Sequence, residues 1–296
     1  MDWHLLLLFL VNGVIVGTLY GVVAMCFVLI YKSTQIVNFA QGQFLLVGAW
    51  ICWAIMVQFG LPFWIGFPIT LVFMFIFGVL LQVVLLRPMI GEPIISVIMM
   101  TIGLSIVLEA LMSWIFGSKV KPFPPIFETS TVSVLGLSVQ SAYLMSFVIS
   151  ILIMLGFFWF FKYSRMGLAM RATAFDQQVA QSLGISVRQV FALSWAISAM
   201  VSALAGVVIG VVNGVSSALA FYGIKVFPAV IIGGLDSIGG GIVGGLAVGI
   251  LENLGAFADN YLHWGSLTQV VPFYALIVVL MIKPYGLFGT KDIERI

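Results

Sequence analysis

The sequence predicts an all-α, polytopic membrane protein: a transmembrane helical bundle of about nine (eight to ten) segments, forming a single transmembrane domain over residues 1–296. Charged residues make up 7% of the chain and hydrophobic residues 62%, whereas soluble domains carry about 25% charged residues. The mean hydropathy is +1.23. Apolar runs of about 20 residues recur along the chain, which is more than one membrane anchor needs.

Composition also disfavours other classes of protein. Residues 5–30 carry no charge and show no alternation of polar and apolar residues, so the chain does not read as a transmembrane β-barrel. A net charge of +2 gives no basic surface for nucleic acid. Cys26 and Cys52 lie inside apolar runs without neighbouring His or Cys, so we expect core packing and no metal site.

Charged and turn residues divide the chain into predicted spans. One segment, 218–233, would be ~24 Å long as a helix, short of a ~30 Å hydrocarbon core, so it either crosses or forms a half-helix. The predicted spans are 5–30, 38–58, 62–86, 94–116, 140–161, 187–212, 218–233, 239–257 and 268–283.

The positions of Lys and Arg predict the orientation. With the N-terminus outside, the cytoplasmic side collects nine of the twelve basic residues, and the other side collects Lys119 and Lys121. Lys225 lies near one end of the short segment. The C-terminus is then cytoplasmic. The nine residues are Lys32, Arg87, Lys162, Arg165, Arg171, Arg188, Lys283, Lys291 and Arg295.

Three spans carry small residues at every fourth position. This spacing aligns them along one side of a helix, where a second helix can approach closely in a membrane. We therefore expect these residues to be helix-packing positions. They are Gly13, Gly17 and Gly21; Ser194, Ser198, Ser202, Gly206, Gly210 and Gly214; and Gly241, Gly245 and Gly249.

Two carboxylates fall within predicted spans, where an unpaired charge is costly. Glu109 continues a polar row with Thr101, Ser105 and Ser113, which should face the bundle. Lining of a translocation pathway and structural pairing both remain open for Ser105 and Glu109. Glu252 lies nearer a span end, where an interfacial or structural role is expected.

Asn38 and Gln41 stand where the second span begins. They fit the N-cap and N3 positions of that helix. They also fit a translocation pathway, because a helix N-terminus inside a pore would favour the carboxylate of an amino acid. Both roles remain open.

The longest charged stretch, 162–189, predicts a short helix on the cytoplasmic side. Thr173 and Asp176 fit a capping box opening a helix over 174–183, with Gly184 in the positive-φ position after it. Phe175, Val179 and Leu183 would share an apolar face that rests either on lipid or on a partner. A second capping box, Ser186 and Gln189, would open the next span.

The sequence offers little for an enzyme. Residues 239–244 match G-x-G-x-x-G but begin a membrane span instead of following a strand, so we discard a dinucleotide site. No Gly-Lys pair occurs, which excludes a P-loop. His4 and His263, the two histidines, lie at span ends, and no nucleophile with a base or metal cluster is indicated.

Several motifs resemble one transporter family, in order along essentially the whole chain. In these motifs and their order, the chain resembles the inner-membrane permeases of bacterial branched-chain amino acid ABC importers. The motifs are Tyr20-Gly-Val-Val-Ala24, Ile30-Tyr-Lys-Ser-Thr34, Asn38-Phe-Ala-Gln-Gly42, Arg165-Met-Gly-Leu-Ala-Met-Arg-Ala172 and Gly233-Gly-Leu-Asp-Ser-Ile-Gly-Gly240.

The resemblance implies a subunit that pairs with a second permease, two cytoplasmic ATPases and a periplasmic binding protein. It implies no cofactor on this chain, with ATP and Mg bound by the partner ATPase subunits. The loop at 165–184 corresponds to the loop that contacts an ATPase in that family. Similar subunits serve importers of urea and short-chain amides, and an autonomous secondary transporter or channel is a further alternative. The implied coupling residues are Arg165, Gly167, Arg171, Thr173, Phe175, Asp176, Val179, Leu183 and Gly184.

Overall fold

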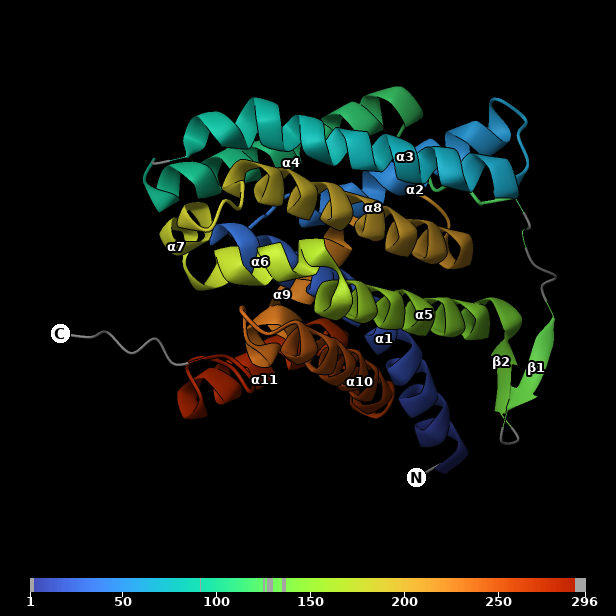
Figure 1. Cartoon of the computed structure of the whole chain (residues 1–296). Coiled ribbons are helices and arrows are strands. Elements are labelled where there is room, and N and C mark those ends of the chain that lie inside the picture. Colours follow the sequence, from blue (N-terminus) through green and yellow to red (C-terminus); the bar gives the residue numbers. More distant parts are fainter. Residues whose placement is uncertain (1–2, 91, 125, 127–129, 135–136, 291–296) are drawn as a thin grey trace. The chain divides into compact units, whose positions relative to one another are not determined.

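The computed structural model describes residues 3–90, 92–124, 126, 130–134 and 137–290, and it is helical throughout apart from one short hairpin (Figure 1). Lys291 and Arg295, used above to predict the orientation, lie outside these residues. The helices are α1 Trp3–Thr34, α2 Gln41–Val57, α3 Phe63–Leu81, α4 Ile94–Phe116, α5 Ser141–Tyr163, α6 Arg165–Phe175, α7 Gln177–Ser182, α8 Val187–Asn213, α9 Phe221–Gly233, α10 Ile238–Leu262 and α11 Leu267–Ile282. Shorter turns are the π-helix η1 Gln82–Leu86 and the 3₁₀ helices η2 Arg87–Met89 and η3 Ser217–Ala220.

The predicted polytopic helical fold is confirmed. Within the described residues, six helices are long and apolar enough to cross a membrane: α1, α3 with its extension to Met89, α4, α5, α8 and α10. Three shorter apolar helices, α2, η3–α9 and α11, accompany them. The segment predicted at 218–233 is short in the structure as well, because α9 has 13 residues, or ~20 Å.

Two short strands are present that the sequence pattern does not predict. β1 (Thr131–Val134) and β2 (Leu137–Gln140) pair antiparallel, with Thr131 opposite Gln140. Both segments alternate apolar and polar residues, which is the period of a strand. They are four residues each, too short to stand out in a chain dominated by apolar helices.

The chain divides into two compact units. The first, here called the α10 unit, comprises residues 1–28, 129–151 and 225–296. The second, the α8 unit, comprises residues 29–128 and 152–224.

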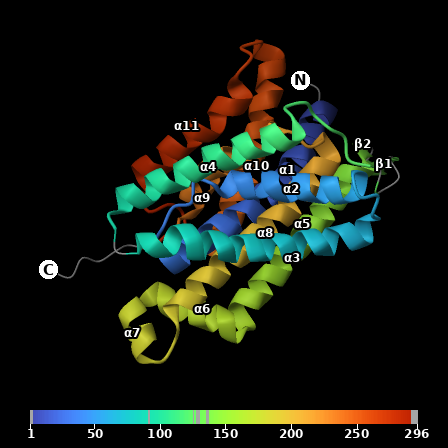
Figure 2. The same ribbon diagram turned by 90° about the horizontal axis from the view of Figure 1, so that it is seen from above.

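In the α8 unit, α2 and α3 pack along α8 (Figure 2). Small residues make these contacts possible. A Cβ at Gly206 would overlap the backbone of Leu45, and one at Gly78 would lie 2.6 Å from the Trp195 carbonyl oxygen. Aromatic rings fill the space beside them: Phe44 meets Trp195 edge-on with centroids 5.9 Å apart. The helices are therefore as close as their backbones allow.

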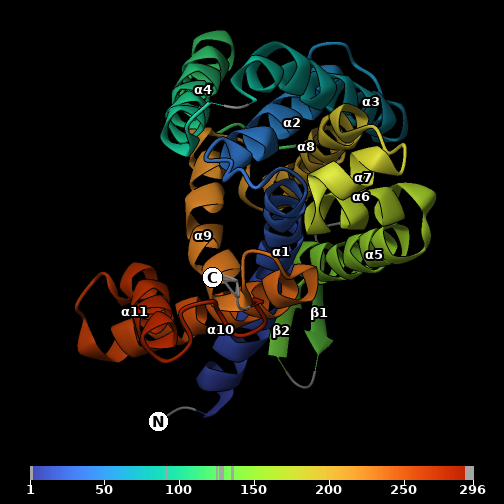
Figure 3. The ribbon, with the colours of Figure 1, turned by 60° about the vertical axis from the view of Figure 1, so that its left-hand side comes forward.

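In the α10 unit, α1 and α10 meet through glycines, and α11 packs on α10 (Figure 3). A Cβ at Gly245 would overlap Gly21, and a Cβ at Gly249 would overlap Gly17. Gly13 continues the row against Ile250, where an added Cβ would lie 3.0 Å from that Cα. Backbone approaches backbone along three turns of both helices.

Candidate functional site

The first candidate site is a buried polar network at the start of α2, in the α8 unit. Asn38 and Gln41 are each 1% exposed. The Asn38 side-chain oxygen accepts from the Ala40 N–H at 3.0 Å, and its Nδ2 donates to Gln41 Oε1 at 3.2 Å. Gln41 Nε2 donates to Ser202 Oγ at 2.5 Å and to Ser198 Oγ at 3.2 Å. Gln41 thus joins the beginning of α2 to the small-residue face of α8.

The predicted capping roles of Asn38 and Gln41 are wrong. α2 begins at Gln41, so its N-cap is Ala40, which makes no side-chain capping bond. Asn38 instead closes the turn before the helix, where its own side chain satisfies an N–H two residues on. Gln41 points its amide across to α8 because two serine hydroxyls are available there.

The polar residues predicted to form one row on α4 each bond to a different group. Thr101 Oγ1 accepts from the Phe39 N–H at 3.4 Å and is fully buried. Ser105 Oγ donates to the Ile102 carbonyl of its own helix at 2.7 Å, so it is not joined to Glu109. Glu109 Oε2 accepts from Gln43 Nε2 at 3.4 Å, and Ser113 Oγ lies 3.1 Å from Ser217 Oγ.

Gln43 is a further polar residue of this region that was not among the predicted site residues. It is 6% exposed on α2 and is the residue that reaches Glu109. The signal was present: an amide stands two positions after Gln41 in an otherwise apolar helix, and residues two apart point to different sides of a helix. Gln41 and Gln43 therefore engage different neighbours, α8 and α4.

In the α10 unit, Glu252 belongs to a buried ion pair. It is 8% exposed, it accepts from the Tyr20 hydroxyl, and Lys225 Nζ lies 2.5 Å from its Oε1. Of the two roles considered for Glu252, these contacts support the structural one, because Tyr20 of α1 and Lys225 of α9 both pair with its carboxylate in α10. Its structural role fits a carboxylate that must be paired in an apolar environment.

The loop predicted to be cytoplasmic contains two helices where one was predicted. Ser164 caps α6, accepting from the Gly167 N–H at 2.8 Å, and α6 continues through Thr173 to Phe175. Thr173 Oγ1 donates to the Ala169 carbonyl at 2.9 Å inside α6, so it is not an N-cap. Asp176 is extended and caps α7, accepting from Gln178 and Val179 N–H at 2.7 and 2.9 Å. A helix starting at Ala174 is wrong because Asp176 breaks it.

The ends of this loop are fixed locally. Gly184 has φ +81°, and the Ile185 N–H donates to the Ala180 carbonyl at 3.0 Å, which ends α7 with a left-handed residue. Ser186 is the N-cap of α8 but makes no side-chain capping bond, so the second predicted capping box is wrong. Arg171 donates to the Phe161 carbonyl, and a Cβ at Gly167 would overlap that same carbonyl. Both contacts hold α6 against the end of α5.

Phe175, Val179 and Leu183 do not share the face of one helix as predicted, because Phe175 ends α6, Val179 lies in α7 and Leu183 follows α7. Phe175 is 94% exposed, Leu183 75% and Val179 54%, and Arg165 is also exposed. Figure 1 shows α6 and α7 at the same end of the α8 unit as the connection between α3 and α4, with the α2–α3 connection at the opposite end. Arg87 belongs to the first of these connections, in η2, so basic segments gather at one end of this unit.

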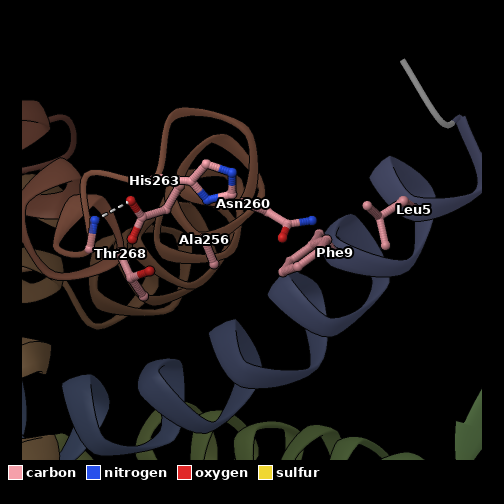
Figure 4. A pocket seen from close by; sticks show the side chains of 8 residues that line it. Leu5, Phe9, Ala256, Asn260, His263 and Thr268 are labelled. Carbon is pink, nitrogen blue, oxygen red and sulfur yellow. Dashed lines mark hydrogen bonds between the residues drawn. The ribbon is translucent and has the colours of Figure 1, made fainter.

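A pocket of ≈ 560 Å³ lies where α10 ends and α11 begins (Figure 4). Its polar groups serve the turn: Asp259 Oδ1 accepts from the Gly265 N–H at 2.6 Å, and His263 has φ 55° as the C-cap of α10. Leu5 and Phe9 of α1 contribute the apolar side. In the described part of the chain, no three His, Cys, Asp or Glu side chains gather to hold a metal.

Together the long apolar helices and their close glycine contacts define a multi-pass helical membrane protein. The family profile described as "Branched-chain amino acid transport system / permease component" matches residues 9–281. The chain belongs to this family: it is a permease component of a branched-chain amino acid ABC transport system.

Individual relatives are similar over nearly their whole length. The high-affinity branched-chain amino acid transport system permease protein BraD of Pseudomonas aeruginosa is 32% identical, with 97% of each chain covered. The corresponding permease protein LivH of Escherichia coli K12 is 31% identical, with 96% of each chain covered. Among solved structures, PsaBC from Streptococcus pneumoniae in complex with Fab matches with a TM-score of 0.52 at 18% identity, over 95% of this chain and 94% of that one. This last similarity concerns the fold alone.

Proposed function

We propose that this permease moves branched-chain, neutral amino acids across the inner membrane, driven by separate ATPase subunits. The observation that carries this proposal is the buried network of Asn38, Gln41, Ser198 and Ser202 inside an apolar bundle. Four uncharged polar side chains meet at the N-terminus of α2, where the positive end of the helix dipole favours a carboxylate. Such a site suits a zwitterionic substrate because it adds no full charge to the membrane interior.

The partner set follows from what this chain lacks. Its sequence has no P-loop, so ATP and Mg belong to partner ATPase subunits, which we propose number two. We further propose a second permease subunit, most simply as a heterodimer, and a periplasmic binding protein that delivers the substrate. Selection among amino acids then rests largely with that receptor, and the permease accepts what the receptor supplies.

We propose α6 and α7 as the contact with the ATPase. The side chains of Phe175, Val179 and Leu183 are exposed, and Arg171 and Gly167 hold the segment that carries them against α5. Burial of three large apolar side chains against a partner is worth several kcal/mol, about 1.5–3 for each. Capping by Ser164 and Asp176 gives the segment a defined shape to present.

Reconstitution tests the proposal. Vesicles holding this permease, its partner permease and the ATPases should accumulate leucine when receptor and ATP are both supplied. Omission of the ATPases or of the receptor should abolish uptake. Leucine transport by the isolated chain would show an autonomous transporter, and uptake of urea or acetamide in place of leucine would reassign the substrate.

A further inference from the structure

Gln43, which is buried, meets the partly buried Glu109 in the α8 unit. Gln43 Nε2 lies 3.4 Å from Glu109 Oε2, across the contact between α2 and α4. Glu109 is seven residues from Phe116 at the end of α4, or ~10 Å along the helix axis. It is therefore well inside the apolar part of a membrane-spanning helix.

This pair is short of a hydrogen-bond donor. Gln43 Oε1 is fully buried and has no hydrogen-bond partner in the described structure. Rotation of the amide by 180° would instead place an acceptor oxygen opposite the Glu109 carboxylate. Either orientation leaves an acceptor that requires an N–H or O–H, and a buried acceptor without one costs free energy.

The charge of Glu109 is also unmatched. Among the residues described here, Glu109 has no Lys, Arg or His within ion-pair distance, in contrast to Glu252 with Lys225. A carboxylate in an apolar surrounding calls for a cation. The missing component is thus a positively charged group carrying several N–H donors.

We propose that Gln43 and Glu109 form the site for the α-ammonium group of the transported amino acid. An alkylammonium has three donors and one positive charge, which answers both deficits: Glu109 supplies the counter-charge and Gln43 Oε1 a second acceptor. The inference deepens the proposed function and depends on it. It also separates the two charges of the substrate, because the α2 N-terminus, two residues away at Gln41, favours the carboxylate.

Backbone of the α9 region lies directly against Gly42, the residue before Gln43. A Cβ at Gly42 would overlap the Ala220 carbonyl, and one at Gly223 would lie 2.5 Å from the Gly42 Cα. The beginnings of α2 and α9 therefore meet beside Gln43 without intervening side chains.

Two probes isolate the ammonium group. Isopentylamine keeps the leucine side chain and the ammonium group but has no carboxylate, whereas 4-methylpentanoate keeps the side chain and the carboxylate but has no ammonium group. Each is used to displace labelled leucine from the purified importer complex in nanodiscs. We expect Glu109→Gln to weaken displacement by isopentylamine about tenfold, or ~1.4 kcal/mol, because the variant removes the counter-charge of the ammonium group. Displacement by 4-methylpentanoate should be unchanged.

A second variant and a control keep the test decisive. Gln43→Leu should weaken displacement by isopentylamine several-fold without removing a charge. Glu92 is an exposed carboxylate before α4, and Glu92→Gln should leave displacement by both probes unchanged. Complex yield and melting temperature identify any variant that fails to fold. Three results would each overturn the site: an equal loss of displacement by both probes in Glu109→Gln, displacement of labelled leucine by sodium ions equal to that by isopentylamine, or no binding of isopentylamine to the wild type. Leucine uptake by the wild-type complex with receptor and ATP reports on the proposed function separately.

Discussion

Lys225 of α9 places its ammonium nitrogen 2.5 Å from a carboxylate oxygen of Glu252 in α10, and the Tyr20 hydroxyl of α1 donates to the same carboxylate. Three helices of the α10 unit thus meet at one charge. The carboxylate side chain is 10% exposed, whereas that of Lys225 is 39% exposed. Loss of the lysine would leave a largely buried charge with one hydroxyl partner.

Lys225→Met should therefore destabilise the protein by about 1–3 kcal/mol, below the 3–5 typical of fully buried pairs because Lys225 is partly exposed. The double variant Lys225→Met/Glu252→Gln should recover part of this loss. Chemical unfolding of the purified protein measures both. Lys119→Met, at an exposed position, is the control, and identical stability of Lys225→Met and the control would mean that the pair contributes nothing.

Glycine contacts give a second prediction. Gly245→Leu and Gly206→Leu should lower the yield of folded protein, because their side chains would enter the backbones of Gly21 and Leu45. Gly103→Leu is a matched control: it lies in a membrane helix, and a Cβ there meets nothing within 4 Å. Size-exclusion chromatography and melting curves compare the three. Normal behaviour of Gly245→Leu would show that α1 and α10 are not in contact.

Orientation is the third prediction. We expect position 130 outside and positions 87 and 188 in the cytoplasm, because nine of the twelve Lys and Arg fall on one side under this topology. Single cysteines at these positions, in a background lacking Cys26 and Cys52, are labelled with an impermeant thiol reagent. Labelling of position 130 only from the cytoplasmic face would reverse the topology.

The polar network gives the fourth prediction. Gln41→Leu should reduce leucine uptake at least several-fold, because it removes the amide that joins Asn38 to Ser198 and Ser202. Three buried polar groups would lose a partner, at ~1–3 kcal/mol each. Gln58→Leu, exposed after α2, is the control. Unaltered uptake in Gln41→Leu would remove this network from the transport pathway.

The sequence anticipated most helices closely, because runs of apolar residues between charges and prolines mark membrane spans directly. The span expected at 187–212 is α8 at Val187–Asn213. Local capping was harder. Thr173 and Asp176 fit a capping box by spacing. However, α6 begins after its N-cap Ser164 and continues to Phe175, so Thr173 lies inside that helix.

The partners of buried polar residues depended on contacts distant in sequence. The contact of Gln41 with Ser202 spans 161 residues, and that of Gln43 with Glu109 spans 66. No local pattern encodes such pairs. The polarity of these residues in an apolar span was visible, whereas their partners are set by the packing of α2 against α8 and α4.

The central claim is that the α6–α7 segment contacts a partner ATPase and couples its ATP hydrolysis to transport. Val179→Asp places a charge on its exposed apolar face, while Gln178→Asp adds the same charge on a neighbouring polar position of α7. A buried unpaired charge at an interface costs several kcal/mol.

The direct measurement is receptor-stimulated ATP hydrolysis together with leucine uptake in vesicles containing the complete importer. We expect Val179→Asp to lose both, and to release the ATPase in a pull-down, while Gln178→Asp retains them. Full hydrolysis, uptake and ATPase retention in Val179→Asp would contradict the account and leave α6 and α7 as helices that merely rest on the membrane.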